Sequence, residues 1–391
     1  MIHVKEAKEL ILEKCNSLKT GLLPLQKATG FILAEPVCSP VDTPPFNQSA
    51  MDGYAFSFEH WDGKSDLTVR GEIQAGDFFA DTLKQFETVR IYTGAALPPG
   101  ADTVIMQEKI TLTGKSITIK DEQLSKGNNV RLQGSQTKKG EITLPAGHYL
   151  TPAAIALLAG TGIDRVKVYS NPTVSIIVTG KELIKPGHPI TDGKIYESNS
   201  SGLIAALNQL SISPASVEVV DDNEDEIFKA ITGQLYTDLL ILTGGISVGD
   251  YDFVATVLEK CGVKKVFHKV KQKPGKPFYF GTCHQTLVFA LPGNPAAVLT
   301  CFYEYVMPAI SSFTKKEYFR KLKLPLANDY RKKKELTYFL KGKTTAHAVS
   351  VLNDQESYLM NSFAIADCII ELEEDKEHFK EGDLVTVQMI I

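Results

Sequence analysis

The feature that most constrains the fold of this 391-residue chain is an alternation of apolar strands and helical segments. The strands are expected at 173–180 (TVSIIVTG), 215–220, 238–245 (DLLILTGG), 263–271 (VKKVFHKVK), 277–281 and 286–291. The helices are expected at 199–210 and from about residues 223, 252 and 295. Strands that alternate with helices predict a doubly wound parallel α/β sheet covered on both faces. Ligands in such sheets bind beyond the carboxyl ends of the strands, where Thr179-Gly180 and Thr243-Gly244 both stand.

The segments on either side of this region have a different character. Residues 54–147 contain short strands and turns, LTVRGEI, TVRIYTG, DTVIMQ and SITIK, and predict an all-β insert. Prolines and an Asp52-Gly53 turn in residues 36–53 mark the crossing into that insert. The tail from about 317 is again strand-like. Helices are expected at 3–20 and at 151–162, where Thr151 can cap the helix.

Charge, cysteines and hydropathy exclude several classes of protein. The net charge of −4 gives no general case for nucleic-acid binding. Six cysteines without a CxxC pair argue against a disulfide framework or a structural zinc site and fit a reducing compartment. The charged N-terminus lacks the apolar core of a signal peptide, and the longest apolar stretch, near 150–163, is too short to span a membrane. We therefore expect a cytoplasmic protein without nucleic-acid or membrane partners.

The first motif with chemical content is TGGISVGDYD, residues 243–252. Its glycines allow a sharp turn whose N–H groups can approach an anion, and the helix that follows favours negative charge at its start. Asp250 and Asp252 beside an anion imply a bridging Mg²⁺ or a general base. The alternative has equal weight: such turns are common in α/β proteins, and Asp252 could simply cap its helix.

The second motif is the lysine-rich run KKVFHKVKQKPGKP, residues 264–277. On a continuous strand Val266 and Val270 share one face, and four lysines share the other: Lys265, Lys269, Lys271 and Lys273. A turn at Pro274-Gly275 would bring Lys276 back to the same edge. Aligned ammonium groups repel one another unless anions lie among them, so we favour an anion site over a solvated edge strand.

Two further motifs are ambiguous by themselves. LPGNPAAV, residues 291–298, brackets Gly293-Asn294 with Pro292 and Pro295 and predicts a rigid turn before a helix. Its amides could receive an oxyanion, or it could be a simple connector. PPFNQSAMDGYAF, residues 44–56, could be a presented loop, but a linker with packed aromatic residues is the better interpretation.

These motifs together, in this order, resemble the molybdopterin molybdenumtransferase family, which includes MoeA and the gephyrin E domain. The segments PFNQSAMDGYA, RIYTGAALPPGADTVI, TGGISVGDYD, KPGKP and LPGNP carry the resemblance, which extends over nearly the whole chain. It implies a multidomain, elongated subunit of α/β plus β class. Its four parts would be a linking domain (1–41 and 141–170), an inserted β domain (42–140), a molybdopterin-binding α/β domain (171–316) and a C-terminal β-barrel (317–391).

The resemblance also implies a reaction and its participants. The expected substrates are molybdate and adenylylated molybdopterin, the products are molybdenum cofactor and AMP, and the expected cofactor is Mg²⁺. Family members are homodimers with a cleft shared between the α/β domain of one subunit and the β domain of the other. Molybdopterin adenylyltransferase and proteins that load molybdoenzymes are the candidate protein partners.

The matching motifs assign the site residue by residue. The expected catalytic residues are Asp52 and Thr93 from the opposing subunit, with Glu182, Asp222, Asp252, Lys269 and Lys273. The expected substrate-binding residues are Gly244, Gly245, Ser247, Gly249, Lys276, Pro292, Pro295 and Ser357. The expected metal ligands are Glu182, Asp222 and Asp252.

The sequence departs from the family pattern at several positions. Lys181 replaces an acid, Ser135-Gln136 occupies another acidic position, and Ala297 lacks a hydroxyl. Lys341 stands at a barrel position that is often Arg. Because two acids are lost and one lysine is gained, we expect weaker binding of divalent cations, which a titration with Mg²⁺ would test.

Two other functions remain open. A molybdopterin adenylyltransferase uses a related α/β domain, but the insert with PFNQSAMDGYA resembles only the molybdenumtransferases. A non-catalytic scaffold of the gephyrin kind would not require Asp52, Asp252, Lys273 and Lys276. The choice between molybdate and tungstate is not determined by the sequence.

Overall fold

The computed structural model describes residues 1–15, 19–246 and 253–390, which belong to two compact units. The α/β–barrel unit consists of residues 1–21 and 169–391. The β-insert unit consists of residues 22–168. The finer division into four parts stays a prediction.

The α/β–barrel unit is built on a six-stranded sheet in the order β16-β13-β17-β21-β20-β18. The strands are β13 (Val174–Thr179), β16 (Ser216–Val220), β17 (Leu239–Thr243), β18 (Lys264–His268), β20 (Tyr279–Cys283) and β21 (Thr286–Leu291). The first four strands in the order are parallel, but β20 and β18 run antiparallel to their neighbours. The prediction of an all-parallel sheet is therefore wrong at this edge, since only two residues separate β20 from β21 and a parallel pair needs a long crossover.

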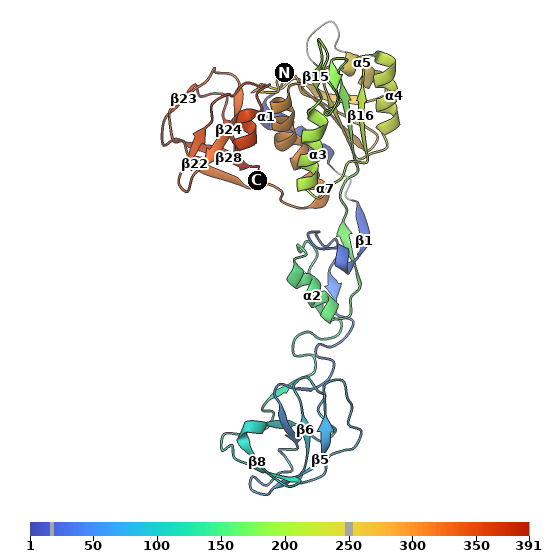
Figure 1. Cartoon of the computed structure of the whole chain (residues 1–391), viewed down its shortest axis with the longest axis vertical. Helices are drawn as coiled ribbons and strands as arrows, with labels where there is room; N and C mark the ends of the chain where they lie inside the picture. The colour runs from blue at the N-terminus through green and yellow to red at the C-terminus, as the bar shows by residue number, and fades with distance from the viewer. Residues whose placement is uncertain (16–18, 247–252, 391) are drawn as a thin grey trace. The chain divides into compact units, whose positions relative to one another are not determined.

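Helices cover both faces of this sheet, which confirms the doubly wound arrangement (Figure 1). One face packs against α1 (Val4–Lys14), α3 (Asn199–Gln209), α6 (Pro295–Cys301) and α7 (Met307–Thr314). The other face packs against α4 (Glu224–Gln234) and α5 (Phe253–Lys260). The N-terminal helix was predicted to reach residue 20, but it ends at Lys14, and Thr20 already belongs to β1 (Thr20–Pro24).

The longest apolar helical stretch is Pro295–Thr314, where the π-helical turn Phe302–Val306 joins α6 to α7. By length and composition alone its 20 residues could cross a membrane, but 78% of its most apolar 18-residue window is buried within the protein. It serves as a core helix of the α/β–barrel unit and is longer than the apolar stretch expected near 150–163.

A second sheet of the same unit has the order β19-β24-β26-β28-β22, with β25 paired to β24. Its strands are β19 (Gln272–Lys273), β22 (Lys321–Pro325), β24 (Thr337–Thr344), β25 (Val349–Val351), β26 (Cys368–Leu372) and β28 (Leu384–Met389). The tail also contains β23 (Tyr330–Arg331), α8 (Asn361–Ile365) and β27 (His378–Phe379). Because β19 pairs in parallel with β24, the lysine-rich run passes from the α/β sheet into the sheet of the tail.

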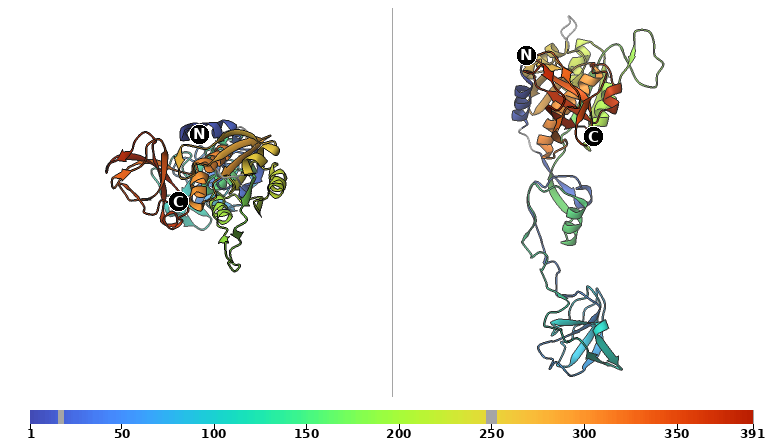
Figure 2. Two further views of the ribbon diagram at one scale, coloured as in Figure 1. Left: turned by 90° about the horizontal axis from the view of Figure 1, so that it is seen from above. Right: turned by 90° about the vertical axis from the view of Figure 1, so that its left-hand side faces the viewer.

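The loop between β13 and α3 contains two short paired strands, β14 (Leu183–Ile184) and β15 (Ile195–Tyr196). This segment extends away from the body of the α/β sheet, as both views of Figure 2 show. Its first residues after β13 include Glu182, so the base of the segment lies at the carboxyl edge of the sheet.

The β-insert unit contains a six-stranded sheet in the order β7-β4-β6-β5-β9-β8. The strands are β4 (Gly53–Phe56), β5 (Leu67–Ile73), β6 (Glu87–Ile91), β7 (Thr103–Met106), β8 (Ile110–Thr113) and β9 (Ser116–Ile119). Smaller pairs join β2 (Val37–Cys38) to β11 (Ile142–Leu144), β3 (Gln48–Ser49) to β10 (Val130–Arg131), and β1 to β12 (Arg165–Tyr169). The predicted cap is confirmed: Thr151 Oγ1 accepts the Ala154 N–H at the start of α2 (Pro152–Gly160).

Candidate active site at the carboxyl edge of the sheet

The two Thr-Gly motifs meet at one edge of the α/β sheet. Thr179 ends β13 and Thr243 ends β17, and the register of the parallel strands brings the following turns together. Gly244 has φ +91°, and a Cβ atom there would lie 2.3 Å from the carbonyl oxygen of Thr179. Only glycine therefore permits this close approach of the two turns.

A cavity of about 540 Å³ opens at this edge and is called here the glycine-turn cavity. Six of the predicted site residues line it: Glu182, Asp222, Gly244, Gly245, Pro292 and Pro295. Its other lining residues come from the end of β13, the loop before α3, the start of α3, the turns that contain Ile246, Pro277 and Gly293-Asn294, and the C-terminal tail, which contributes Tyr358. The structure thus brings together residues that lie far apart in the sequence.

Three buried polar atoms on residues of this cavity have no hydrogen-bond partner among the described residues. They are Thr179 Oγ1, Asn199 Oδ1 and Asp222 Oδ1. A buried polar atom without a partner costs about 1–3 kcal/mol. All three belong to residues that line the cavity, which favours a polar ligand or a cation in this part of the fold.

A smaller pocket of about 230 Å³ adjoins the glycine-turn cavity and is called here the lysine pocket. The two share Pro277, Pro292 and Asn294. Lys273, Lys276 and Ser357 line the lysine pocket, as does Ala297, the position without a hydroxyl. Within the described part of the chain, neither lysine forms a salt bridge. Two uncompensated ammonium groups at one small pocket are suited to bind an oxyanion.

The expected row of four aligned lysines is wrong. The strand β18 ends at His268, and Lys269 has a left-handed backbone with φ +73°. Lys271 Nζ lies 3.4 Å from His3 Nε2, and Lys265 Nζ lies 3.3 Å from Glu259 Oε1. The left-handed residue and the change of sheet interrupt the two-residue alternation, so Lys269 lines neither the glycine-turn cavity nor the lysine pocket.

Sequence reasoning missed Gln272, which is only 1% exposed. Its Nε2 donates to the carbonyl oxygen of Gly275 at 3.0 Å, and its Oε1 accepts the hydroxyl of Tyr305. Gln272 therefore holds the KPGK turn between the two lysines of the pocket. A single glutamine within a lysine run carries no sequence signal for this role, because its partner Tyr305 lies 33 residues away.

Replacing Tyr305 with phenylalanine is expected to lower the free energy of unfolding by about 1–3 kcal/mol, because Gln272 Oε1 loses its partner in a buried place. Affinity for the oxyanion should fall with it, since the same glutamine holds the KPGK turn. Urea unfolding and calorimetric titration with molybdate would measure the two effects. Tyr303→Phe is the matched control, because the Tyr303 hydroxyl makes only a 3.5 Å contact with Gln209 Oε1. Equal losses of affinity in both variants would contradict the role given to Gln272.

The LPGNP turn contributes residues to both cavities. It joins β21 to α6, which confirms the predicted turn before a helix. Asn294 precedes Pro295 at the start of α6, and its Nδ2 donates to Ser357 Oγ at 2.7 Å. The Ala296 N–H donates to the carbonyl oxygen of Ser357 at 3.1 Å. Ser357 of the C-terminal tail thus contacts the start of α6.

Asp52 and Thr93 are brought together in the β-insert unit. Asp52 Oδ1 accepts both the N–H and the hydroxyl of Thr93 at 2.8 Å, and these two hydrogen bonds lower the pKa of the Asp52 carboxyl. The guanidinium of Arg90 lies 5.1 Å from the ring centroid of Tyr54 and 5.3 Å from that of Tyr92. Asp52 is therefore held ionised in a fixed orientation, while its catalytic role stays a prediction.

Several predicted residues have other placements. Ser247, Gly249, Asp250 and Asp252 lie outside the described residues. Lys181 is exposed beside Glu182, and Gln136 is exposed in the β-insert unit. Lys341 is buried and lines neither the glycine-turn cavity nor the lysine pocket.

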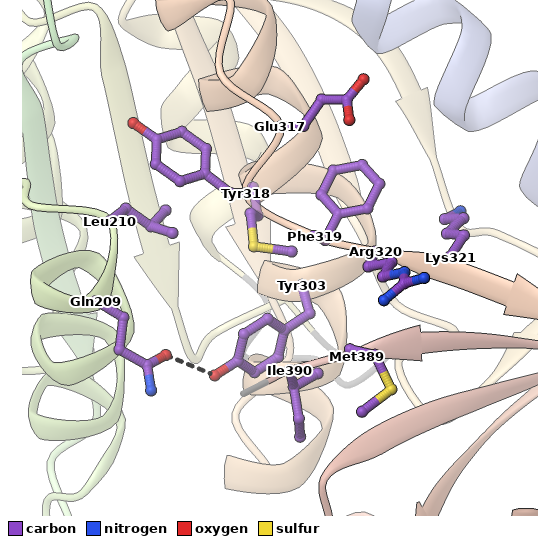
Figure 3. Close-up of a pocket in the computed structure, with 11 residues that line it drawn as sticks. Gln209, Leu210, Tyr303, Glu317, Tyr318, Phe319, Arg320, Lys321, Met389 and Ile390 are labelled. Atoms are coloured by element: carbon purple, nitrogen blue, oxygen red, sulfur yellow. Dashed lines mark hydrogen bonds between the residues drawn. The ribbon is translucent and has the colours of Figure 1, made fainter. Parts of the chain in front are cut away.

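A larger cavity, of about 720 Å³, lies away from these residues (Figure 3). It is lined by the end of α3, by Tyr303 and Met307, by residues 317–321 and by the C-terminal Met389 and Ile390. In Figure 3 the side chains of Tyr303 and Gln209 point toward each other across one side of it. The buried oxygens of Thr179, Asn199 and Asp222, which have no partner in the part of the chain that the structure describes, belong to residues of the glycine-turn cavity, which is why we place the chemistry there.

Comparison with known proteins agrees with the motifs. The chain is 36% identical over 400 residues to the molybdopterin molybdenumtransferase of Haemophilus influenzae, with 99% of this chain and 98% of the relative aligned. The chain belongs to the molybdopterin molybdenumtransferase family. Residues 2–162 match the MoeA N-terminal region (domain I and II), residues 175–312 a probable molybdopterin binding domain, and residues 323–390 the MoeA C-terminal region (domain IV). The family resemblance expected from the motifs is confirmed.

Other molybdopterin molybdenumtransferases and two solved structures show the same relationship. The relative from a Nostoc species is 38% identical over 300 residues, which cover 74% of this chain and 69% of its own. Two crystal structures of the molybdopterin biosynthesis MoeA protein from Pyrococcus horikoshii cover 100% of this chain, with TM-scores of 0.86 and 0.77 at 28% and 29% identity. They cover 99% and 100% of their own chains, so the match includes every part of the molybdopterin molybdenumtransferase fold described above.

Proposed function

We propose that the protein transfers molybdenum from molybdate to adenylylated molybdopterin and releases molybdenum cofactor and AMP. The observation that carries this proposal is the pair of adjoining cavities. One has glycine turns and buried polar atoms, and the other has two lysines; among the described residues, those polar atoms have no hydrogen-bond partner and the lysines no carboxylate partner. A large polar substrate and a small oxyanion can therefore occupy neighbouring places.

The glycine-turn cavity suits the organic substrate. Its volume of about 540 Å³ lies within the range of ordinary ligand sites. The sharp turns at Gly244 and Gly245 allow backbone amides to approach phosphate oxygens, and Asn199 and Thr179 offer polar atoms for a pterin ring. The lysine pocket, which shares Pro277, Pro292 and Asn294 with that cavity, would hold molybdate next to the reacting end of that substrate.

We also propose a Mg²⁺ site at the glycine-turn cavity, to which the described residues contribute two carboxylates but no cluster of three or more metal-binding side chains. Asp222 Oδ1 is a buried carboxylate oxygen without a partner among the described residues, and Glu182 lines the same cavity. Glu182 and Asp222, with Asp252, would hold the ion, because oxygen ligands from one or two carboxylates are what Mg²⁺ prefers beside phosphate groups. A bound Mg²⁺ would neutralise developing charge on phosphate oxygens. The exposed Lys181 beside Glu182 supports the hypothesis of weaker cation binding, which an ordinary dependence on Mg²⁺ concentration would refute.

The direct test uses purified protein, adenylylated molybdopterin and either molybdate or tungstate, with AMP release as the readout. We expect oxyanion-dependent release of AMP, and the ratio of the two rates gives the oxyanion preference. Formation of adenylylated product from ATP and metal-free molybdopterin would instead favour the adenylyltransferase. No AMP release under any condition would favour the scaffold.

We further propose that the working form is a homodimer in which Asp52 and Thr93 of one subunit serve the cavities of the other. The motif match in both units supports this. We also propose a cytoplasmic location, because the six cysteines are all free thiols, which a reducing compartment preserves.

The shared cleft predicts a particular result when inactive variants are mixed. At a molybdate concentration well below the raised KM of Lys276→Ala, Asp52→Asn and Lys276→Ala should each show little activity alone. If subunits exchange at random, half the dimers are mixed and each has one intact site, so activity should return to about a quarter of wild type. The returned activity is measured as AMP release after the mixture has been unfolded and refolded.

The matched control mixes Asp52→Asn with Thr93→Ala. Both changes lie in the β-insert unit, so every site in the mixed dimer carries one of them and no activity should return. An inactive mixture of Asp52→Asn and Lys276→Ala would show that the cleft is not shared.

A further inference from the structure

A buried lysine lies at the centre of the loop that carries Ser357 and Tyr358. Lys341, on β24, is 4% exposed. Its Nζ donates to the carbonyl oxygens of Asp354 at 2.6 Å, Glu356 at 3.2 Å and Leu359 at 3.1 Å. All three hydrogens of the ammonium group are thereby used by one loop, residues 352–360, called here the 352–360 loop.

Gln355 joins the same loop to the backbone of β24. Its Oε1 accepts the Lys341 N–H at 2.9 Å, and its Nε2 donates to the carbonyl oxygens of Lys341 at 2.9 Å and Leu352 at 2.8 Å. Ser362 Oγ adds a hydrogen bond to the carbonyl oxygen of Asp354 at 2.7 Å. These hydrogen bonds hold the 352–360 loop against β24, with the Lys341 ammonium at their centre.

The other side of the 352–360 loop reaches the candidate active site. Ser357 makes both contacts with the start of α6, through Asn294 and Ala296. Ser357 lines the lysine pocket and Tyr358 lines the glycine-turn cavity. One loop of the C-terminal tail thus forms part of both cavities.

We propose that Lys341 is a positioning residue, which holds the 352–360 loop against the start of α6 and so sets the geometry of oxyanion binding by Ser357, Lys273 and Lys276. The part about the oxyanion rests on the proposed function. Without the ammonium group, three carbonyl oxygens of the loop lose their common donor, and a buried acceptor without a partner destabilises the conformation that buries it. Hydration of these carbonyl oxygens then stabilises an open loop relative to the loop packed against α6.

Direct binding of the oxyanion by Lys341 is a different role, and the contacts oppose it. Its three hydrogens already have acceptors, and the residue does not line the lysine pocket. Burial lowers the pKa of Lys341, while Asp354 and Glu356 raise it. The carbonyl oxygens therefore compensate an ammonium group that water no longer solvates.

The test compares Lys341→Met, which removes the donors, with Lys341→Arg, which keeps charge and donors. In the full-length protein, Lys341→Met should speed hydrogen exchange at residues 352–360 and at Ala296, relative to the amides of β26. Molybdate affinity measured by calorimetry should fall about 10-fold or more, the size expected when the displaced loop costs the oxyanion one charge-assisted hydrogen bond. Lys341→Arg should keep the slow hydrogen exchange of the loop and most of the molybdate affinity.

Val387→Ala is the control for lost stability. Val387 is fully buried in the core of the same sheet, and its change creates a cavity without touching the loop's hydrogen bonds. It should destabilise the protein while molybdate affinity stays unchanged. Ser357→Ala should lower molybdate affinity, and its combination with Lys341→Met should lower it little further, because both act through one loop.

The outcomes separate this inference from the proposed function. If wild-type protein binds no molybdate, the proposed function fails, and hydrogen exchange of the loop still decides the role of Lys341. Unchanged exchange at residues 352–360 in Lys341→Met would overturn the inference. Full additivity of Lys341→Met and Ser357→Ala on molybdate affinity would overturn it as well.

Discussion

Replacing Lys276 with alanine is expected to lower molybdate affinity about 10- to 100-fold, the range of one lost charge-assisted hydrogen bond. Lys273→Ala should have a similar effect, and the double variant should bind molybdate too weakly to measure. Both lysines line the lysine pocket, and neither forms a salt bridge among the described residues, so their charge is available to an anion. Calorimetric titration with molybdate, and AMP release at rising molybdate concentration, would show the loss mainly as a higher KM for molybdate.

Lys271→Ala and Lys265→Ala are the matched controls within the same lysine-rich run. Lys271 contacts His3 and Lys265 contacts Glu259, so neither ammonium group serves the pocket. Both variants should keep wild-type affinity. If all four alanine variants lose affinity equally, the run acts as one diffuse positive surface, and the division of the lysines derived from the structure is wrong.

The parts of the site that follow strand ends were predictable from the sequence. Glycines after the apolar strands β13 and β17 indicated turns at the carboxyl edge, because parallel strands place their ends together. The acids Glu182 and Asp222, which the family resemblance assigned, follow strands β13 and β16 of the same sheet and line one cavity. LPGNP was equally readable, since its prolines permit only a turn before a helix.

The contacts that depend on pairing between distant segments were not predictable. The lysine alternation presumed one continuous strand, but β19 pairs with β24 in the other sheet, about 65 residues away in sequence. The sequence placed Lys341 only at a barrel position that is often Arg, and it did not show that the ammonium group donates to carbonyl oxygens of the 352–360 loop. Tertiary packing decides whether a lysine faces a pocket or backbone carbonyl groups, and local periodicity in the sequence does not predict that packing.

The site therefore depends on two kinds of support. The glycine-turn cavity is built by strand ends of one sheet, with Gly244 and Gly245 allowing the turns to approach. The lysine pocket is built where β19, the LPGNP turn and the 352–360 loop meet, and buried side chains hold its parts: Gln272 with Tyr305, and Lys341 with Gln355. Substitutions at these holding residues should lower the affinity for the oxyanion, whereas substitutions at the glycine turns should lower the affinity for the organic substrate.

The second large effect is expected from Gly244→Ala. The residue has φ +91°, and a Cβ atom would lie 2.3 Å from Thr179 O and 2.8 Å from Thr179 Oγ1. The left-handed conformation and the overlap together should lower the free energy of unfolding by about 2–5 kcal/mol, or force the turn to move. Because the turn lies at the glycine-turn cavity, adenylylated molybdopterin should lose measurable binding even in protein that remains folded.

Gly262→Ala separates the two causes. Gly262 has φ +80°, close to that of Gly244, but a Cβ atom there would meet nothing within 4 Å. Its cost should be about 1 kcal/mol, the penalty of the backbone conformation alone, with substrate binding unchanged. Urea unfolding of both variants measures the difference, which reports the overlap with Thr179. If Gly244→Ala is no less stable than Gly262→Ala and binds substrate normally, the close approach of the two turns is not what shapes the cavity.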